Sequence, residues 1–328
     1  MGLVGEKKSM TDMQKNSLQK VVVIVGPTAS GKTSFVLDIA KHLPIEVISA
    51  DSRQLYKKMT IGTAKPTGEW KWHTSWRGLR HTFYVDAVAH HLVDIIDPGT
   101  RFTVAEFRDR AMKYIKLAYK NDRIPFVVGG TGLYVSSLVD NYKIPRIAAN
   151  KKLRNSLEEK SHEQLLRLLT EMDPLSAETI DKHNKRRLIR ALEVCILSGG
   201  KFSAHRQKGE PMFDFLQVGI DVPRPLLYER INTRIDAMMA EGLLDEIQAL
   251  RKQKYSWELP SMSGIGYRQF KEHLDGDMSL ETAVEQLKRD TRRYARRQMS
   301  WFRRDKRIEW FSDALALEQR VKEFLELP

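Results

Sequence analysis

Apolar residues along the first half of the chain follow the pattern of a buried strand and then that of a helix. Residues 21–25 (VVVIV) are continuously apolar and β-branched, as is typical of a strand covered on both faces of a parallel sheet. Behind them Phe35, Ile39 and Leu43 recur every fourth residue, a spacing that predicts a helix. Residues 45–50 (IEVISA) predict a second strand.

The same alternation continues beyond residue 100. Thr103 and Glu106 have the spacing of a capping box, and the apolar face behind them predicts a helix that ends near Asn121. Residues 124–128 (IPFVV) predict another buried strand. Strands that alternate with helices favour an α/β fold, a doubly wound parallel sheet with right-handed crossovers.

The pattern changes after residue 141. From 142 to 200 we find helical patterns and no convincing strand, whereas 215–220 (FLQVGI) predicts a strand that returns to the sheet. We therefore expect four segments: a disordered tail (1–19), the first part of a core domain (20–141), a helical insertion domain (142–200) and a completion of the core with basic C-terminal helices (201–328).

Composition narrows the class of protein. Of 328 residues, 41% are hydrophobic, enough for a core, yet no apolar run is long enough for a transmembrane helix. The N-terminal residues lack a secretory signal, so we expect a cytoplasmic protein with no membrane association. The single cysteine, Cys195, excludes an intramolecular disulfide. A net charge of +13 suggests a polyanionic partner.

A phosphate-binding loop follows the first strand. Residues 26–33 (GPTASGKT) match the pattern G-x-x-x-x-G-K-[ST], with a strand before and a helix after. In such a loop Lys32 reaches the outer phosphate and the Thr33 hydroxyl suits Mg²⁺. The residues expected to surround a diphosphate are Gly26, Pro27, Thr28, Ala29, Ser30, Gly31, Lys32 and Thr33.

An ATPase needs an aspartate at the end of a second strand, and the strand that best fits this position lacks one. The strand at 124–128 ends in Gly129, Gly130 and Thr131. A second candidate strand, 92–97, contains Asp94 and Asp97, which we interpret as solvated or capping residues. This weakens the ATPase interpretation and favours a different diphosphate.

Polar residues also follow the strand at 45–50. Asp51-Ser52-Arg53-Gln54 comes directly after it, and Thr131 follows the strand at 124–128. Because the carboxyl ends of strands form the ligand crevice of an open α/β sheet, Asp51 and Thr131 should converge on the phosphate loop. Asp51 there is a candidate general base, and a helix cap is the alternative.

Eight ordered motifs carry a resemblance over roughly residues 20–310: GPTASGKT, DSRQ, GTAKP (62–66), HHLVDIIDP (90–98), GGTGLY (129–134), RRLIRALEV (186–194), SGIGYR (263–268) and YARRQMSWFRRD (294–305). The chain resembles the bacterial tRNA dimethylallyltransferase, or isopentenyl-tRNA transferase, family. The resemblance implies a P-loop NTPase-like fold and transfer of a dimethylallyl group from dimethylallyl diphosphate to N6 of adenosine 37, 3′ to the tRNA anticodon. It implies Mg²⁺ as cofactor, and dimethylallyl diphosphate and the tRNA anticodon stem-loop as partners. We expect a monomer with no obligate protein partner.

The resemblance also assigns roles to residues. It implies catalytic roles for Asp51, Thr131 and Lys32, and a pyrophosphate ligand at Arg230 or Arg234, without deciding between the two. The implied tRNA-binding residues are Asp51, Ser52, Arg53, Gln54, Thr131, Arg154, Arg186, Arg187, Leu188, Ile189, Arg190, Ser263, Gly264, Ile265, Gly266, Tyr267, Arg268, Arg293 and Arg297. The alignment is weakest at Arg154.

Two further segments bear on nucleic-acid binding. Residues 286–307 contain ten Lys or Arg, with Arg289, Arg293 and Arg297 at four-residue spacing, which favours contact with RNA phosphates. Residues 67–89 interleave three tryptophans with basic residues and are longer than we expect in the family. They indicate either a base-stacking surface or a surface hairpin specific to this lineage.

Three other functions remain open. An adenylate isopentenyltransferase would share the phosphate loop and Asp51 but would have less need of the helical insertion. A small-molecule kinase with the same loop would not need the GGTGLY motif. A non-catalytic RNA-binding protein would not need Lys32, Asp51 and Thr131 together.

Overall fold

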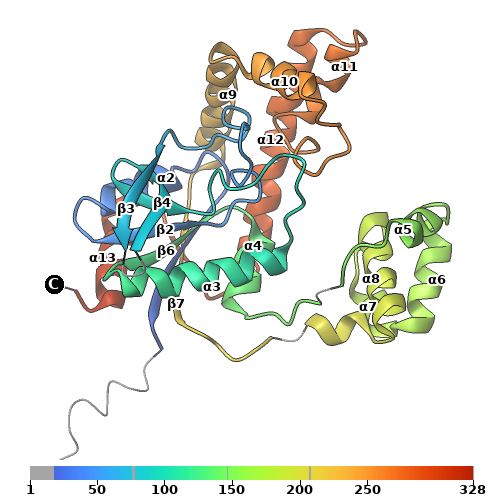
Figure 1. Cartoon of the computed structure of the whole chain (residues 1–328), viewed down its shortest axis with the longest axis horizontal. Helices are drawn as coiled ribbons and strands as arrows, with labels where there is room; N and C mark the ends of the chain where they lie inside the picture. The colour runs from blue at the N-terminus through green and yellow to red at the C-terminus, as the bar shows by residue number, and fades with distance from the viewer. Residues whose placement is uncertain (1–17, 76–77, 146, 207, 328) are drawn as a thin grey trace, which may run out of the picture. The chain divides into compact units, whose positions relative to one another are not determined.

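The structure is a computed structural model of the chain, and it describes residues 18–75, 78–145, 147–206 and 208–327. Within them eight strands form one sheet in the order β3-β4-β5-β2-β6-β1-β7-β8 (Figure 1). The strands are β1 (Lys20–Val25), β2 (Ile45–Ser49), β3 (Glu69–Ser75), β4 (Gly78–Val85), β5 (Val88–His91), β6 (Ile124–Gly129), β7 (Asp214–Ile220) and β8 (Glu309–Phe311).

Six of these strands run parallel, and a hairpin is added at one edge. β5, β2, β6, β1, β7 and β8 pair in parallel, whereas β3 and β4 pair antiparallel and β4 is antiparallel to β5. The chain reaches β2 and β6 on one side of β1 and β7 and β8 on the other. The sheet therefore reverses its winding at β1, where an open α/β sheet forms its ligand crevice.

The helices are α2 (Lys32–Ile39), α3 (Val104–Lys120), α4 (Gly132–Val139), α5 (Lys151–Glu158), α6 (His162–Met172), α7 (Pro174–Thr179), α8 (Lys185–Ser198), α9 (Arg224–Ala240), α10 (Leu243–Lys252), α11 (Lys271–Leu274), α12 (Leu280–Phe302) and α13 (Ala314–Leu325), with short 3₁₀ turns at Phe202–Arg206 and Arg268–Phe270. None of the described helices is long and apolar enough to cross a membrane.

The chain divides into two compact units. The first holds the chain up to Phe102, Arg110–Val135 and the chain from Met212 onward; the second holds Thr103–Asp109 and Ser136–Pro211. The sheet lies in the first unit. The second contains α5 to α8, which confirms the expected helical character of 142–200.

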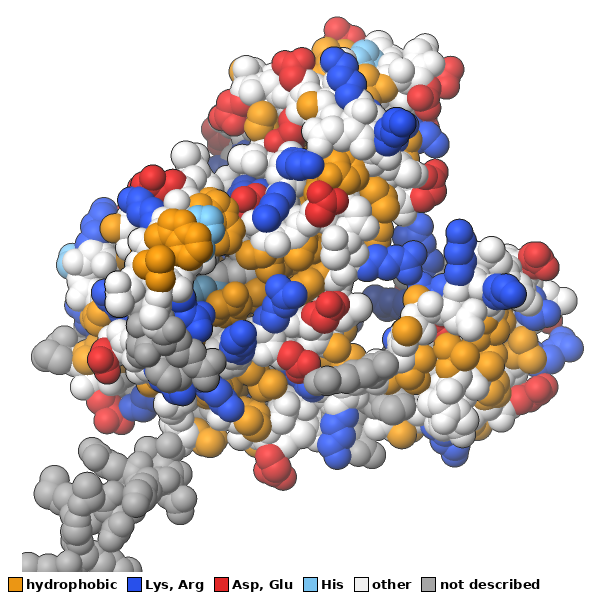
Figure 2. Space-filling model, in the orientation of Figure 1, with side chains coloured by type: hydrophobic (Ala, Val, Ile, Leu, Met, Phe, Trp, Pro, Cys, Tyr) orange, Lys and Arg blue, Asp and Glu red, His pale blue; other side chains and the backbone are white. Residues whose placement is uncertain are grey.

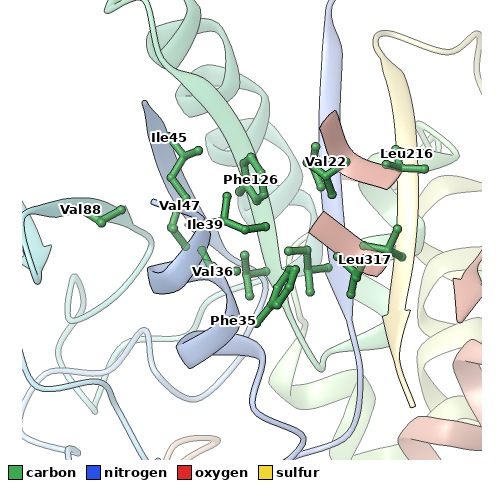
Figure 3. Close-up of a cluster of buried hydrophobic side chains, with 14 residues drawn as sticks. Val22, Phe35, Val36, Ile39, Ile45, Val47, Val88, Phe126, Leu216 and Leu317 are labelled. Carbon is green, nitrogen blue, oxygen red and sulfur yellow. The ribbon is translucent and has the colours of Figure 1, made fainter. Parts of the chain in front are cut away.

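The main core lies between one face of the sheet and two helices. Phe35, Val36 and Ile39 of α2 pack against Val22 and Phe126 of the central strands (Figure 3). Leu317 and Val321 of α13 belong to the same cluster. Burying side chains of this size contributes about 1.5–3 kcal/mol each, so this cluster holds α2 and the loop before it firmly on β1.

Most of the predicted elements are present. The four buried strands of the sheet are confirmed, and so is the capping box, in which Thr103 N donates to Glu106 at 2.8 Å and Glu106 N to Thr103 at 3.2 Å. The candidate strand at 92–97 is not one of the described strands, because β5 ends at His91 and the backbone then turns through positive φ at Leu92 (62°) and Asp94 (56°). We did not predict β5 or β8. The expected tail falls mostly on 1–17, outside the described residues.

Candidate active site

One cavity of about 580 Å³ lies at the carboxyl ends of the central strands, within the first unit. Loops after β1, β2 and β6 line one side, and α9, α12 and residues 263–268 line the other. The predicted site residues in its wall are Thr28, Ala29, Ser30, Gly31, Lys32, Thr33, Asp51, Ser52, Arg53, Gln54, Thr131, Arg234, Ser263, Ile265, Gly266, Arg268 and Arg297. Folding thus gathers segments up to 270 residues apart, as the hydrogen bond between Thr28 and Gln298 shows.

The phosphate loop is closed around its own lysine. Gly31 has φ 89°, a backbone conformation that favours glycine, and α2 begins at the next residue. Lys32 Nζ donates to the carbonyl oxygens of Gly26 (3.0 Å) and Pro27 (2.6 Å). Burial lowers the pKa of Lys32 to about 8, and the neighbouring charge of Arg234 adds to this, whereas Asp51 opposes it. Gly26 and Pro27 therefore contribute carbonyl groups to Lys32 and do not line the cavity.

Asp51 holds its own loop through one carboxylate oxygen. Arg53 N and Gln54 N donate to Asp51 Oδ1 at 2.7 and 3.3 Å. These are the hydrogen bonds that the described residues make to this carboxylate, and neither involves Oδ2. The capping role that we kept as an alternative is thus present, and one oxygen stays available for chemistry.

Thr131 joins the Asp51 loop to α12. Ser52 N donates to Thr131 Oγ1 at 3.0 Å, and the Tyr294 hydroxyl is hydrogen-bonded to Thr131. Burial, reinforced by the charge of Asp51, raises the pKa of Tyr294 to about 12, so the phenol stays protonated at neutral pH. Asp51, Thr131 and Tyr294 form one polar wall of the cavity.

One face of α12 supplies residues that the sequence analysis missed. Leu287, Thr291, Tyr294, Gln298 and Trp301 all line the cavity. Their spacing of four, three, four and three places them on a single face of the helix. This spacing is present in the sequence, but the arginines between these positions favoured an interpretation based on the opposite face of the helix.

Gln298 and Trp301 fit against glycines of the two loops. Gln298 accepts from Thr28 N and donates to Gly130 O, each at 2.9 Å. A Cβ at Gly132 would lie 2.3 Å from the Trp301 ring, so only glycine admits the tryptophan here. The helix thereby fixes the phosphate loop and the GGTG loop relative to each other.

The structure separates the two candidate arginines. Arg234 lines the cavity, burial lowers its pKa, and its charge acts on Lys32. Arg230 is exposed on α9 one turn earlier and is not part of the cavity wall. Beside Arg234 the wall is apolar, formed by Ile231, Ile235, Met238 and Leu287.

The SGIGYR segment packs directly against the GTAKP segment. Gly266 has φ 103°, and a Cβ there would lie 2.4 Å from Gly62 O. The Tyr267 side chain is only 1% exposed, and its hydroxyl donates to Glu246 at 2.8 Å. Glu246 also accepts from the backbone N–H groups of Thr60, Ile61 and Gly62.

Burial corrects the expected tRNA contact of three side chains. Leu188 and Ile189 are 0% and 3% exposed in the core of the second unit, and Tyr267 is buried in the first. Leu188 and Ile189 lie on the apolar face of α8, so their side chains serve packing. Gly264 is also buried, and a Cβ at this position would lie 3.2 Å from Arg53 Nε.

Four arginines of the second unit form two groups, one bound to a buried carboxylate and one exposed on the surface. Arg154 forks onto the fully buried carboxylate of Glu193 (2.8 and 2.7 Å), and Arg190 donates to the same carboxylate at 2.6 Å. These arginines, with the Asn150 N–H, lower the pKa of Glu193 to about 2 despite its burial. Arg186 and Arg187 are exposed on the first turn of α8.

The arginines of α12 also divide by face. Arg289, Arg293 and Arg296 are exposed and lie on the side of the helix away from the cavity. Arg293 Nη1 lies 3.8 Å from Asp290 Oδ1. Arg297 lines the cavity edge, 5.8 Å from the Tyr294 ring, whereas Arg292 donates to Asn232 of α9 at 2.6 Å.

The donor set of the cavity bears on a metal ion. Among the described residues no group of three His, Cys, Asp or Glu could hold a metal by itself. Thr33 and Asp51 are in the cavity wall beside the phosphate loop. This set fits Mg²⁺, which keeps several waters and binds through substrate phosphates with few protein ligands.

Comparison with known proteins identifies the family. The family model for IPP transferase matches residues 54–305, and the model for isopentenyl transferase matches residues 19–76. The tRNA dimethylallyltransferase of Acetivibrio thermocellus is 41% identical over 302 residues, 90% of this chain and 92% of the relative. The chain belongs to the IPP transferase family.

Solved structures of this family have the same fold. The full-length tRNA isopentenylpyrophosphate transferase of Bacillus halodurans is 37% identical, with a TM-score of 0.67 over 94% of this chain and 97% of that one. A eukaryotic dimethylallyltransferase acting on tRNA is 25% identical, with a TM-score of 0.74 over 94% of this chain and 80% of that one. The family fold is thus α/β with a mostly parallel central sheet.

Proposed function

We propose that this protein transfers a dimethylallyl group from dimethylallyl diphosphate to N6 of adenosine 37 in tRNA and releases pyrophosphate. The observation that carries the proposal is the single cavity in which the phosphate loop, Asp51 and Thr131 meet, in a chain of this family. The fold around the loop is P-loop NTPase-like in this proposal. The choice of tRNA as the acceptor rests on the relatives, whose names specify tRNA.

The diphosphate is held at the phosphate loop. Backbone N–H groups before α2, Lys32 and Arg234 face it, and the apolar wall at Ile235 and Met238 suits the prenyl chain. As the bond between C1 and the diphosphate oxygen breaks, negative charge grows on pyrophosphate, and the two cations stabilise it. Mg²⁺ bound by the phosphates and the Thr33 hydroxyl would neutralise further charge.

The acceptor amine is activated on the opposite side. N6 forms the new bond to C1 and loses one proton, which Asp51 accepts through the oxygen that its own loop does not use. Thr131, held by Ser52 N and Tyr294, orients the acceptor beside Asp51. Products are N6-dimethylallyl adenosine in tRNA, pyrophosphate and a proton.

The proposal is tested by incubating the protein with dimethylallyl diphosphate, Mg²⁺ and unmodified tRNA, followed by nucleoside analysis. The expected result is N6-dimethylallyladenosine at position 37, with stoichiometric pyrophosphate. AMP in place of tRNA tests the adenylate transferase, and ATP alone tests a kinase or ATPase. Prenylation of free AMP or rapid ATP turnover, without tRNA product, would reject the proposal.

A further inference from the structure

The β3–β4 hairpin is a feature of the first unit that the proposed reaction does not use. It extends the sheet at the edge beyond β5, and hydrophobic side chains gather over it, with histidine beside them (Figure 2). Two tryptophans lie on the face of the hairpin that also carries the buried Phe83, and they differ in environment. Trp72 is 65% exposed and stacks on His81, whereas Trp70 is half-buried and packs against Phe83.

Trp70 reaches from the hairpin to an ion pair between the buried Lys65 and the partly buried Asp94. Its indole N–H donates to Asp94 Oδ2 at 3.0 Å. The other oxygen of Asp94 accepts from Lys65 Nζ at 2.6 Å, and the Lys65 side chain is 3% exposed. Lys65 also donates to Tyr56 O at 2.6 Å. The carboxylate of Asp94 is thus satisfied from two segments, one of them the hairpin.

The backbone of Asp94 in turn holds the loop of the candidate base. Asp94 N donates to Gln54 O at 2.8 Å, and Gln54 N is one of the two donors to Asp51. The Gln54 side chain donates to Ala64 O at 3.0 Å, which ties in the GTAKP segment. A continuous chain of hydrogen bonds therefore runs from Trp70 through Asp94 and Gln54 to Asp51.

Asp94 needs support in the position that it occupies. Its φ is 56°, in the left-handed region, which is strained for a residue other than glycine. The hydrogen bonds that the Asp94 carboxylate accepts from Lys65 and Trp70 offset this strain. Removing one of them should let the turn relax and the N–H of Asp94 move away from Gln54.

We propose that the hairpin is a buttress for the Asp51 loop, with Trp70 as a positioning residue that acts through Asp94 and Gln54. Trp70 does not touch the substrate in this proposal; it sets the orientation of the base. The inference rests on the proposed function for its kinetic consequence, but its structural consequence can be measured separately.

The test compares Trp70→Phe with Trp72→Phe in the full chain. Trp70→Phe keeps an aromatic ring, although a smaller one, and removes the N–H donor to Asp94, so kcat for tRNA prenylation should fall about three- to tenfold. The KM for dimethylallyl diphosphate and the Kd for pyrophosphate should stay at the wild-type values, because the phosphate loop has its own contacts. A structural defect alone would not split kcat from KM in this way. Trp72→Phe, on the same face, should leave all three constants unchanged.

Amide hydrogen exchange provides the readout that does not depend on the reaction. In Trp70→Phe, exchange in residues 53–57 and 92–96 should accelerate about tenfold, with no change in α9, which is not part of the cluster around Trp70. Wild-type kcat or wild-type exchange in this variant would overturn the buttress. Equal losses in Trp70→Phe and Trp72→Phe would also overturn it and favour direct stacking of RNA on the hairpin. If the wild type makes no prenylated tRNA, the proposed function fails while the exchange result still decides the positioning role.

Discussion

In the proposed reaction, Asp51 combines a structural and a chemical task in one carboxylate. Oδ1 accepts from Arg53 N and Gln54 N, so the side chain shapes its loop before it meets a substrate. An asparagine can accept the same backbone hydrogen bonds but cannot take up a proton at neutral pH. The substitution Asp51→Asn therefore separates the two tasks.

We expect Asp51→Asn to lower kcat about 100-fold or more, the usual range for a general base. Pyrophosphate affinity should remain within twofold of wild type. Single-turnover prenylation and calorimetry measure the two quantities. Asp38→Asn, on the exposed side of α2 and paired only with Lys41 among the described residues, is the matched control and should be silent. Near-wild-type turnover in Asp51→Asn would show that Asp51 is not the general base.

The lowered pKa of Lys32 predicts a pH dependence for the proposed binding of a diphosphate. Its pKa of about 8 in the free protein means that it loses its proton as pH rises through 8. An anion at the loop favours the protonated form, so binding takes up a proton above that pH. Affinity for pyrophosphate should therefore fall by up to about tenfold per pH unit between 8 and 9.

Lys32→Met serves as the reference, because it removes the titrating group and leaves the titration of pyrophosphate itself unchanged. The wild-type to variant affinity ratio should be constant from pH 6.5 to 7.5 and decline above 8. Calorimetry in two buffers of different ionisation enthalpy measures the proton uptake directly. A ratio independent of pH up to 9.5 would contradict a depressed pKa at Lys32.

At the scale of elements, α12 shows how one helix can serve two purposes. The face at Leu287, Thr291, Tyr294, Gln298 and Trp301 lines the cavity. The opposite face carries exposed arginines. Because the period of the helix separates these faces, changes on the outer face should leave the donor site intact.

In the second unit, Glu193 is the charge on which α5 and α8 depend. It is fully buried and paired with Arg154 and Arg190, so Glu193→Gln leaves two guanidinium groups without their anion. Since both arginines are partly exposed, the expected loss of unfolding free energy at pH 7 is about 2–3 kcal/mol. Hydrogen exchange in α5 and α8 at pH 7 measures it.

The sign of the pH dependence follows from the lowered pKa of Glu193. The folded pKa of about 2 lies below 4.5, so this stabilisation is complete above pH 4.5 and is lost as pH falls toward 2. The difference between wild type and Glu193→Gln should shrink over that range in thermal unfolding followed by circular dichroism. Glu163→Gln, on an exposed side chain of α6, should cost less than about 0.5 kcal/mol. Equal effects of both substitutions would contradict the buried-pair interpretation.

For the whole molecule, a net charge of +13 predicts salt-dependent binding to tRNA. Each phosphate contact releases counterions, so log affinity should decrease linearly with log salt. Arg293→Ala with Arg296→Ala, on the outer face of α12, should weaken tRNA binding and make the slope shallower by about one to two. Pyrophosphate binding should not change.

The control removes two exposed charges of the same sign elsewhere. Lys113→Ala with Lys116→Ala, on α3, changes the net charge equally. Filter binding at 50–300 mM salt gives the slopes. The same slope change in both double variants would mean that net charge alone governs binding, and an unchanged slope in the α12 variant would remove this face from the interface.

Local patterns determined much of the fold and of the donor side of the site. The apolar runs predicted the buried strands because a parallel strand covered on both faces is a nearly continuous hydrophobic run. The phosphate loop was readable because its glycines set the backbone, and its lysine and threonine supply the side chains, within eight consecutive residues. Asp51 and Thr131 were found because strand ends in an open sheet must converge.

Only the tertiary structure decided contacts between distant segments. It placed Arg234 and not Arg230 in the cavity wall, and it buried Leu188 and Tyr267. It also brought Gln298 into hydrogen-bond contact with Thr28 of the phosphate loop. It also turned Asp94 from an expected solvated or capping residue into the acceptor for Lys65 and Trp70. A one-dimensional period tells which face of a helix is apolar, but which partner covers that face, and which charge meets its counterion, depends on how non-local segments pack.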